Sequence, residues 1–518
     1  MSTFRYGLDH LTVSIALNIL SGKIRGVVDP STKKSIERAH NIVVNVAKKE
    51  AAVYGINTGF GPLCNTKIPT DKTTQLQENL LKSHSVGVGN PIDKDLAKLM
   101  LILKLQSLSR GYSGISMEII DRILWHIEED IIPIVPEQGS VGASGDLAPL
   151  SHLFLPLIGE GKLMYKGKTV STAEVWQSEN KETIKLHPKA GLALINGTQF
   201  ILAHAVMVVD TLHNCLSHAD LIGAMMVEGL LGSRTPFRDI LHKTRPYKGN
   251  THVAGRLSAF LDNSEIAMSH LDCDRVQDPY SLRCMPQVHG SSRNAWLHLR
   301  EAVEVELNSV TDNPVVFDED TIISAGSFHG QPIALPLDYA CLAAAEIGNI
   351  SDRRSYFSLE GPAEGTPKLL MQDTGINSGF MIVQYTAAAL ASENKGLCFP
   401  SSADSIPTSL GQEDHVSMGS IGGRKALTVC RNVIKILATE LLCAAQAFDF
   451  RKPLKSSKII DAVHAEIRTK ITHATEDRIF GDDISIAIDI INSKSLLSIV
   501  DELKTKPFSQ FDDLFEKF

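Results

Sequence analysis

A regular repeat of apolar residues near the end of the chain constrains its fold more than any other feature. Between residues 427 and 448, apolar side chains recur at alternating steps of three and four residues, which is the spacing of one helix face. A long helix with one such face belongs in a helical bundle. The repeat consists of Leu427, Cys430, Ile434, Leu437, Leu441, Ala444 and Phe448.

Several other segments also carry the helical spacing. Residues 94–110 and 117–129 predict core helices, Pro286 begins a further long helix, and residues 377–395 predict an Ala-rich one. A small hairpin is predicted around a turn at Lys166-Gly167. Aromatic residues make up only 6% of the chain, which favours packed helices over a β-sandwich. These patterns favour a fold of packed helices that includes a long bundle helix.

The 518 residues are enough for two to four domains with a large core. We expect a smaller N-terminal region, residues 1–195, that carries two glycine-rich loops, one at Tyr54 and one at Ala143-Ser144-Gly145. Residues 196–518 are then expected to form the long central bundle and the C-terminal helices.

Charge and composition exclude several classes of protein. A net charge of −8 provides no basic field for nucleic acid or an anionic membrane. No run reaches the roughly 18 uninterrupted apolar residues of a membrane span, and the start lacks a signal-peptide pattern. The eight scattered cysteines, without a Cys-x-x-Cys pair, indicate reduced core residues and not a disulfide framework or a metal site. We expect a cytoplasmic protein without a metal.

The segment from Gly139 to Leu147 carries unusual chemistry at its centre, Ala143-Ser144-Gly145. The small neighbours of Ser144 let the backbone fold back, so that the Gly145 nitrogen can attack the Ala143 carbonyl. Loss of two waters, one of them carrying the Ser144 hydroxyl, gives an electrophilic 4-methylideneimidazole-5-one. Taken alone, the tripeptide also fits an ordinary loop or helix cap. It is not a hydrolase nucleophile elbow, because residue 146 is aspartate where that motif needs glycine.

Three segments together make the chain similar to a known family: residues 54–61, 139–147 and 412–415. In them the chain resembles the aromatic amino acid ammonia-lyases, from about residue 54 to about residue 452. The resemblance implies an all-α fold, a long-helix bundle of the ammonia-lyase and fumarase type. It also implies a homotetramer whose active sites are shared between subunits. The prosthetic group would form autocatalytically from Ala143, Ser144 and Gly145, with no external cofactor.

The resemblance also implies roles for individual residues. Tyr54, in a loop with three glycines in eight residues, matches the family's active-site tyrosine. Asn196 matches an asparagine that hydrogen-bonds the carbonyl of the prosthetic group; from local sequence alone it also fits the cap of the helix that follows. Phe328 matches a residue beside the group, although Ser327 stands where the commoner form has asparagine.

The segment from residue 271 to residue 287 has too many charges for a core helix, and we expect an irregular ligand-binding loop. Arg283 can form a bidentate pair with a substrate carboxylate, although a structural ion pair is the alternative. By resemblance, Gln277 helps to orient the prosthetic group. Either Tyr54 or Tyr280 is the catalytic base, and the sequence leaves that choice open. A tyrosine pKa is ordinarily about 10, so nearby helix N-termini would have to favour the phenolate.

Two short motifs bear on substrate choice. The pair Ser83-His84 is typical of histidine-specific family members, but some tyrosine-specific relatives share it. In the pair Gln412-Glu413, the carboxylate can accept a hydrogen bond from an imidazole N–H; a helix-capping glutamate is the alternative. Together these residues predict elimination of ammonia from L-histidine to give trans-urocanate. Whether the substrate's amine or its ring attacks the electrophile stays open.

Three alternatives remain at this stage. A tyrosine or phenylalanine ammonia-lyase and an aminomutase use the same prosthetic group, whereas an inactive helical scaffold would never cyclise its loop. The segment from residue 359 to residue 367 has a glycine and proline content that departs from the usual family form.

Overall fold

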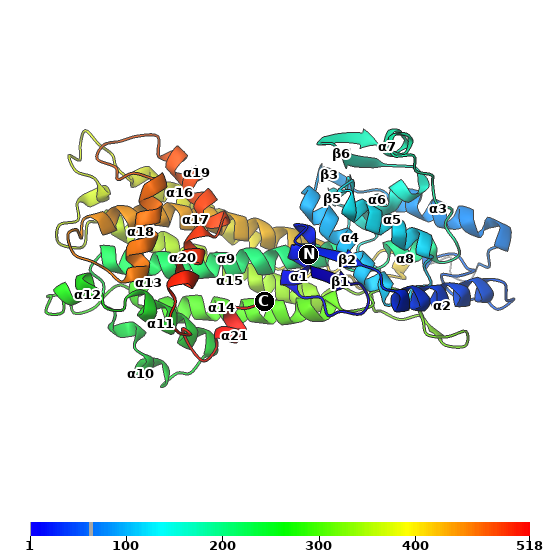
Figure 1. Ribbon diagram of the computed structural model, residues 1–518, viewed down its shortest axis with the longest axis horizontal. Coiled ribbons are helices and arrows are strands. Elements are labelled where there is room, and N and C mark those ends of the chain that lie inside the picture. The colour runs from blue at the N-terminus through cyan, green and yellow to red at the C-terminus, as the bar shows by residue number, and fades with distance from the viewer. Residues whose placement is uncertain (1, 62–65) are drawn as a thin grey trace. The chain divides into compact units, whose positions relative to one another are not determined.

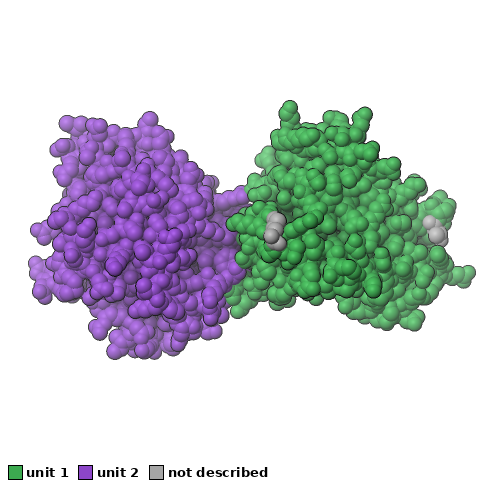
Figure 2. Space-filling model, in the orientation of Figure 1, with its two compact units in different colours: residues 1–207, 300–338, 400–424 green, residues 208–299, 339–399, 425–518 purple. Residues whose placement is uncertain are grey.

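The computed structural model describes residues 2–61 and 66–518, and Figure 1 shows that helices make up most of it. This confirms the all-α fold class with long helices. The chain divides into two compact units, coloured in Figure 2: unit 1 holds residues 1–207, 300–338 and 400–424, and unit 2 holds the rest. Unit 1 thus extends past the expected N-terminal region, and the boundary at residue 195 stays a prediction. Cys64 lies outside the described residues.

Unit 1 contains eight helices that belong to it alone and all of the described strands. The helices are α1 (Val13–Leu20), α2 (Pro30–Ala47), α3 (Thr73–His84), α4 (Lys94–Ser109), α5 (Met117–Glu128), α6 (Leu147–Phe154), α7 (Thr172–Ser178) and α8 (Ala190–Ile195). The strands are β1 (Ser2–Arg5), β2 (Ile24–Val27), β3 (Val88–Pro91), β4 (Ile132–Pro133), β5 (Pro136–Gln138), β6 (Lys162–Tyr165), β7 (Lys168–Ser171), β8 (Val315–Val316) and β9 (Ile322–Ile323). They form three pairs and one three-stranded sheet, β4-β6-β7.

Local sequence accounts for much of unit 1. Asp29 caps α2 by accepting the Ser31 N–H, and Pro30 occupies the first turn, where its missing N–H costs nothing. The predicted hairpin is confirmed as β6 and β7, with Lys166 and Gly167 both at positive φ in the turn. The predicted helices over residues 94–110 and 117–129 are α4 and α5. Every residue of α4 from position 99 to 109 is buried, so this helix lies inside the core.

Four long helices contribute residues to both units: α9 (Gln199–Gly229), α14 (Met285–Leu307), α15 (Gln331–Leu359) and α17 (Gly419–Asp449). Helix α17 contains the whole apolar repeat that predicted it. Within unit 2 these helices lie side by side, because the Trp296 indole donates to the Val209 carbonyl at 2.8 Å and the Ser292 hydroxyl donates to the Ala343 carbonyl at 2.8 Å. Arg354 of α15 forms a buried pair with Glu440 of α17.

The remaining elements belong to unit 2. They are α10 (Asp239–His242), α11 (Lys248–Phe260), α12 (Glu265–Ser269), α13 (Tyr280–Arg283), α16 (Met381–Leu397), α18 (Lys458–Lys470), α19 (Phe480–Asn492), α20 (Ser495–Leu503) and α21 (Asp512–Phe515). Two helices, α9 and α15, are long and apolar enough to cross a membrane by length and composition alone. Protein buries 78% and 72% of their most apolar stretches, as in the core helices of a bundle.

Candidate active site

The Ala143-Ser144-Gly145 loop has a backbone that few sequences can adopt. Ser144 has a φ of +50° and Gly145 a φ of +78°, both in the left-handed region. A Cβ on Gly145 would lie 2.1 Å from the Gly197 carbonyl oxygen, so only glycine fits. The Ser144 carbonyl accepts the Gly197 N–H at 3.4 Å, and the Asp146 N–H donates to the Gly197 carbonyl at 2.8 Å. Neither of these two hydrogen bonds involves the Gly145 nitrogen.

Asp146 fixes the end of this loop on the first turn of α9. One carboxylate oxygen accepts the N–H groups of Phe200 at 3.1 Å and Ile201 at 2.9 Å, and the other accepts the Ser140 hydroxyl at 3.0 Å. Burial raises the pKa of the Asp146 carboxyl to about 7, although these donors oppose the shift. The cap that the sequence suggested for Asn196 is wrong. Asn196 ends α8, and Asp146 takes the free N–H groups of α9 instead.

Asn196 lies directly beside the loop, one residue before Gly197. Its side-chain Nδ2 donates to the Asn313 carbonyl at 2.8 Å. Its Oδ1 is buried, and no hydrogen-bond partner for it exists among the described residues. The main-chain carbonyl of Asn196 accepts a hydrogen bond from the buried Lys104 ammonium of α4. A buried side chain with spare hydrogen-bonding capacity is thus held next to the loop.

Glu413 meets Ser144 although 269 positions separate them in the chain. The Ser144 hydroxyl donates to Glu413 Oε1 at 2.7 Å. The other carboxylate oxygen accepts the Thr408 hydroxyl at 3.0 Å and the Ser409 hydroxyl at 2.7 Å. Ala143 packs in the same place, in a buried cluster with Val416, Met418 and Val141. The structure therefore brings the reactive loop and the Gln412-Glu413 motif together.

His84 ends α3 and is partly buried. The Ser83 hydroxyl lies 3.0 Å from His84 Nδ1. Burial lowers the pKa of the His84 imidazole, while a hydrogen bond to the Leu80 carbonyl and the charge of Glu413 oppose that shift. The Glu413 carboxylate is therefore near enough to act on His84 electrostatically, and the imidazole is neutral at ordinary pH.

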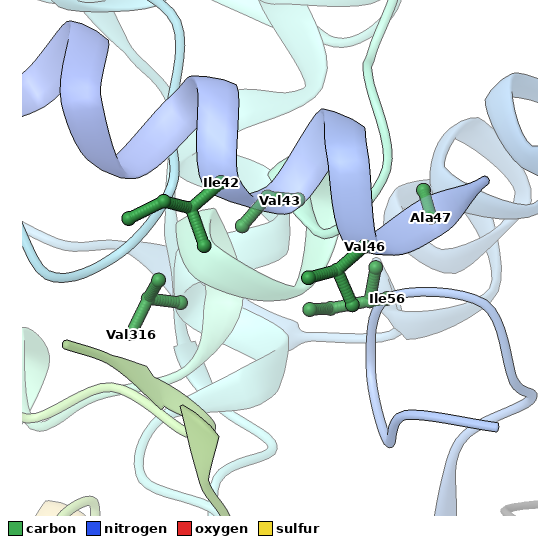
Figure 3. Close-up of a cluster of buried hydrophobic side chains, with 6 residues drawn as sticks. All are labelled: Ile42, Val43, Val46, Ala47, Ile56 and Val316. Atoms are coloured by element: carbon green, nitrogen blue, oxygen red, sulfur yellow. The ribbon is translucent and has the colours of Figure 1, made fainter. Parts of the chain in front are cut away.

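The Tyr54 loop is anchored by its neighbour Ile56. Figure 3 shows Ile56 in a buried apolar cluster with four side chains of α2 and with Val316 of β8. Asn57 closes the turn, because its side-chain oxygen accepts the Val53 N–H at 2.7 Å. A Cβ on Gly55 would lie 2.6 Å from a Leu192 methyl, so this glycine also permits a close approach. The partly buried Tyr54 is thus carried by a firmly packed turn.

The loop with Phe328 is tied to the Glu413 segment by two histidines. His329 Nε2 lies 3.3 Å from His415 Nδ1, and the two rings stack. The Gln331 N–H donates to His329 Nδ1 at 3.2 Å, so the proton of a neutral His329 is on Nε2 and points at His415. Phe328 itself is partly buried, whereas Gln412 is exposed.

Gln277, Tyr280 and Arg283 belong to unit 2. Arg283 Nε donates to the Asp278 carbonyl at 2.9 Å, and its guanidinium lies 4.7 Å from the centre of the Tyr280 ring. Tyr280 is 71% exposed and Gln277 is also exposed. The unusual segment 359–367 holds this loop, because Arg275 donates to the Pro362 carbonyl at 2.7 Å. Unit 1 carries the other candidate residues.

The residues of the loop fit a prosthetic group built from the chain. The backbone turn at Ser144 and the space that only glycine leaves at position 145 both suit a cyclised loop. In the described part of the chain, no three His, Cys, Asp or Glu side chains gather as a metal site would require.

Sequence reasoning missed several residues of this site. Asp146 belongs to the reactive segment, but its only signal in the sequence is a carboxylate directly after Ala-Ser-Gly, which predicts no role. Lys104 stands at an apolar position between Leu103 and Leu105, which is the signal of a buried charge. The Thr408 and Ser409 hydroxyls had no signal, because their role depends on where Glu413 folds.

Comparisons with known proteins agree on one family. The model of the family described as "Aromatic amino acid lyase" matches residues 11–469. The histidine ammonia-lyase of Idiomarina loihiensis is 44% identical over 470 residues, 90% of this chain and 92% of its own. The crystal structure of histidine ammonia-lyase from Trypanosoma cruzi has a TM-score of 0.90 at 37% identity, covering 99% of this chain and 97% of that one. A tyrosine aminomutase from Streptomyces globisporus has a TM-score of 0.92 at 32% identity, covering 98% and 100%.

Proposed function

Since the chain belongs to the aromatic amino acid lyase family, we propose that it is a histidine ammonia-lyase that converts L-histidine into trans-urocanate and ammonia. The relatives at 44% and 37% identity carry that name, and they match nearly the whole chain. Backbone similarity does not separate this activity from that of an aminomutase, because both kinds of structure match equally well. The choice therefore rests on the site.

The hydrogen bond between Ser144 and Glu413 carries the proposal. Cyclisation removes the Ser144 hydroxyl, so Oε1 of Glu413 then loses its donor and can accept one from a substrate. An imidazole N–H is such a donor, as is the tyrosine hydroxyl, whereas the phenyl ring of phenylalanine has none. Oε2 keeps its two hydroxyl donors, which hold the carboxylate in place. We propose that Glu413 and the neutral His84, supported by Ser83, bind the substrate imidazole.

The chain itself supplies the prosthetic group in this proposal. The Gly145 nitrogen bonds to the Ala143 carbonyl carbon, and the carbonyl oxygen leaves as water with the protons of the Gly145 and Ser144 nitrogens. The Ser144 hydroxyl leaves as a second water with the proton on the Ser144 Cα. The resulting 4-methylideneimidazole-5-one supplies an electrophile that makes the substrate amine a better leaving group. No external cofactor is needed.

The other candidate residues bind and orient the substrate. Arg283 holds the carboxylate through its guanidinium, and Tyr54 or Tyr280 removes the β-proton. Asn196 holds the carbonyl of the cyclised loop through its side-chain amide. Gln277, Phe328 and Gln412 line the site and fix the orientation of the group and the substrate.

We further propose a cytoplasmic homotetramer with active sites shared between subunits. Tyr280 is 71% exposed and Val276 of the same loop is fully exposed, so the loop has a surface that a partner can cover. Helices α15 and α16 also expose large apolar side chains, which is typical of an interface. The set is Tyr339, Leu342, Tyr356, Ile382 and Tyr385.

The test is product formation from L-histidine, L-tyrosine and L-phenylalanine in parallel, followed by ultraviolet absorbance and by chromatography for β-amino acids. We expect urocanate from L-histidine only, no activity from Ser144→Ala and a large loss of kcat/KM in Glu413→Gln. Glu319→Gln, which changes an exposed carboxylate of the same unit, is the matched control and should keep full activity. An aryl acrylate formed mainly from L-tyrosine or L-phenylalanine would indicate the ammonia-lyase of that amino acid instead. A β-amino acid as the main product would indicate an aminomutase.

A further inference from the structure

A buried lysine lies next to the reactive loop without a role in the reaction described so far. Lys104 stands in the middle of α4, and its side chain is only 1% exposed. Burying an ammonium group is unfavourable unless it is paired or well hydrogen-bonded. Its Nζ donates to the main-chain carbonyl of Asn196. The unfavourable burial of this ammonium group beside the reactive loop indicates a functional reason for its position.

The position of that hydrogen bond is specific. The Asn196 carbonyl and the Gly197 N–H belong to the same peptide group, and the Gly197 N–H donates to the Ser144 carbonyl at 3.4 Å. A cation on the carbonyl side of a peptide polarises it, and hydrogen bonds in such a chain strengthen one another. One peptide group therefore connects the Lys104 ammonium to the carbonyl of the residue that reacts.

The groups around Lys104 act on the protonation of its amine in opposite directions. Burial lowers the pKa of Lys104 to about 7, while the Asp312 carboxylate opposes that shift and the neighbouring Lys189 adds to it. Lys189 is also fully buried, but it is directed elsewhere, with its ammonium 2.6 Å from Asp312 and 3.0 Å from the Ser113 carbonyl. Only Lys104, of these two buried lysines, reaches the Asn196 carbonyl.

The Ser144 carbonyl is the one that the proposed cyclised group retains. It lies next to the Cα that loses a proton in the second dehydration, and it is conjugated with the methylidene carbon that results. A stronger hydrogen-bond donor at this oxygen makes that Cα proton more acidic and the methylidene carbon more electrophilic.

We propose that Lys104 is a positioning residue for the self-processing of the Ala143-Ser144-Gly145 loop, which acts through the Asn196–Gly197 peptide on the Ser144 carbonyl. This inference rests on the proposed function, since it assumes that the loop cyclises. It assigns Lys104 an effect on both the rate of cyclisation and the electronic state of the cyclised group.

The experiment follows the mass of newly made protein in a cell-free synthesis, because a cyclised chain is lighter by two water molecules. Lys104→Met keeps the length of the side chain and removes its donor, and Lys104→Arg keeps both donor and charge. We expect the loss of mass to be about tenfold slower in Lys104→Met, as for the loss of one charge-assisted hydrogen bond, and largely restored in Lys104→Arg. The ultraviolet band of the cyclised group should move to shorter wavelength in Lys104→Met.

Lys189→Met is the matched control, because it also removes a buried lysine of the same unit. Equal effects of Lys104→Met and Lys189→Met, or a folded Lys104→Met with the rate and ultraviolet band of the wild type, would overturn the inference. If Lys104→Met does not fold, Lys104→Gln, which keeps a neutral donor, decides by the same two readouts. A wild-type chain that never loses two waters would instead refute the proposed function itself.

Discussion

Replacing Gly145 by alanine tests the geometry of the reactive loop most directly. The glycine has a φ of +78°, and an added Cβ would lie 2.1 Å from the Gly197 oxygen, 2.5 Å from its carbonyl carbon and 2.8 Å from its nitrogen. All three are main-chain atoms, so no side chain can rotate away. The segment around Gly197 must move, and the hydrogen bonds that join it to Ser144 and Asp146 must break.

The magnitude follows from three contributions. The left-handed backbone disfavours alanine by about 1 kcal/mol. Each of the two hydrogen bonds to Gly197 contributes about 1 kcal/mol. Together they raise the free energy of the backbone geometry needed for ring closure by about 3 kcal/mol, which slows cyclisation by about a hundredfold. Gly145→Ala should therefore accumulate as the uncyclised chain and lack ammonia-lyase activity.

Gly167 supplies a matched control within the same unit. Its φ is +75°, but nothing lies within 4 Å of a Cβ added there, so Gly167→Ala carries only the backbone term of about 1 kcal/mol. Intact mass gives the cyclised fraction, and thermal unfolding gives the stability. We expect Gly167→Ala to cyclise fully with a slightly lower unfolding midpoint. A Gly145→Ala chain that cyclises as completely as Gly167→Ala would refute the argument from close approach.

Two further predictions concern charged groups. Burial raises the Asp146 pKa from 3.8 to about 7. Between these two pH values the folded state holds a proton on Asp146 that the unfolded state has lost. The stability that this proton contributes is therefore lost as the pH rises through about 7. The unfolding midpoint of the wild type should therefore fall relative to that of Asp146→Asn over this range, and parallel curves would contradict the prediction. For Arg283→Lys we expect the KM for L-histidine to rise about ten- to a hundredfold, because lysine cannot form the bidentate pair. An unchanged KM in steady-state kinetics would contradict binding of the substrate carboxylate by Arg283.

Local sequence predicted the elements whose physical causes are local. The apolar repeat from residue 427 to residue 448 predicted α17, because the spacing of side chains on one face depends only on helical periodicity. The hairpin at Lys166-Gly167 follows from the need for positive φ in its turn. The Ala143-Ser144-Gly145 chemistry is likewise local, since the reacting atoms belong to three adjacent residues.

The tertiary structure decided which distant groups meet. Ser144 and Glu413 are 269 positions apart, and only the packing of the Val416 segment against Ala143 brings their side chains together. From local sequence, Asn196 also fits a cap of α9, but Asp146 accepts those N–H groups instead, because the direction in which α9 leaves the loop sets which acceptor faces them. Periodicity shows that a residue is buried, but what a buried polar group binds depends on the packing of elements far apart in the chain.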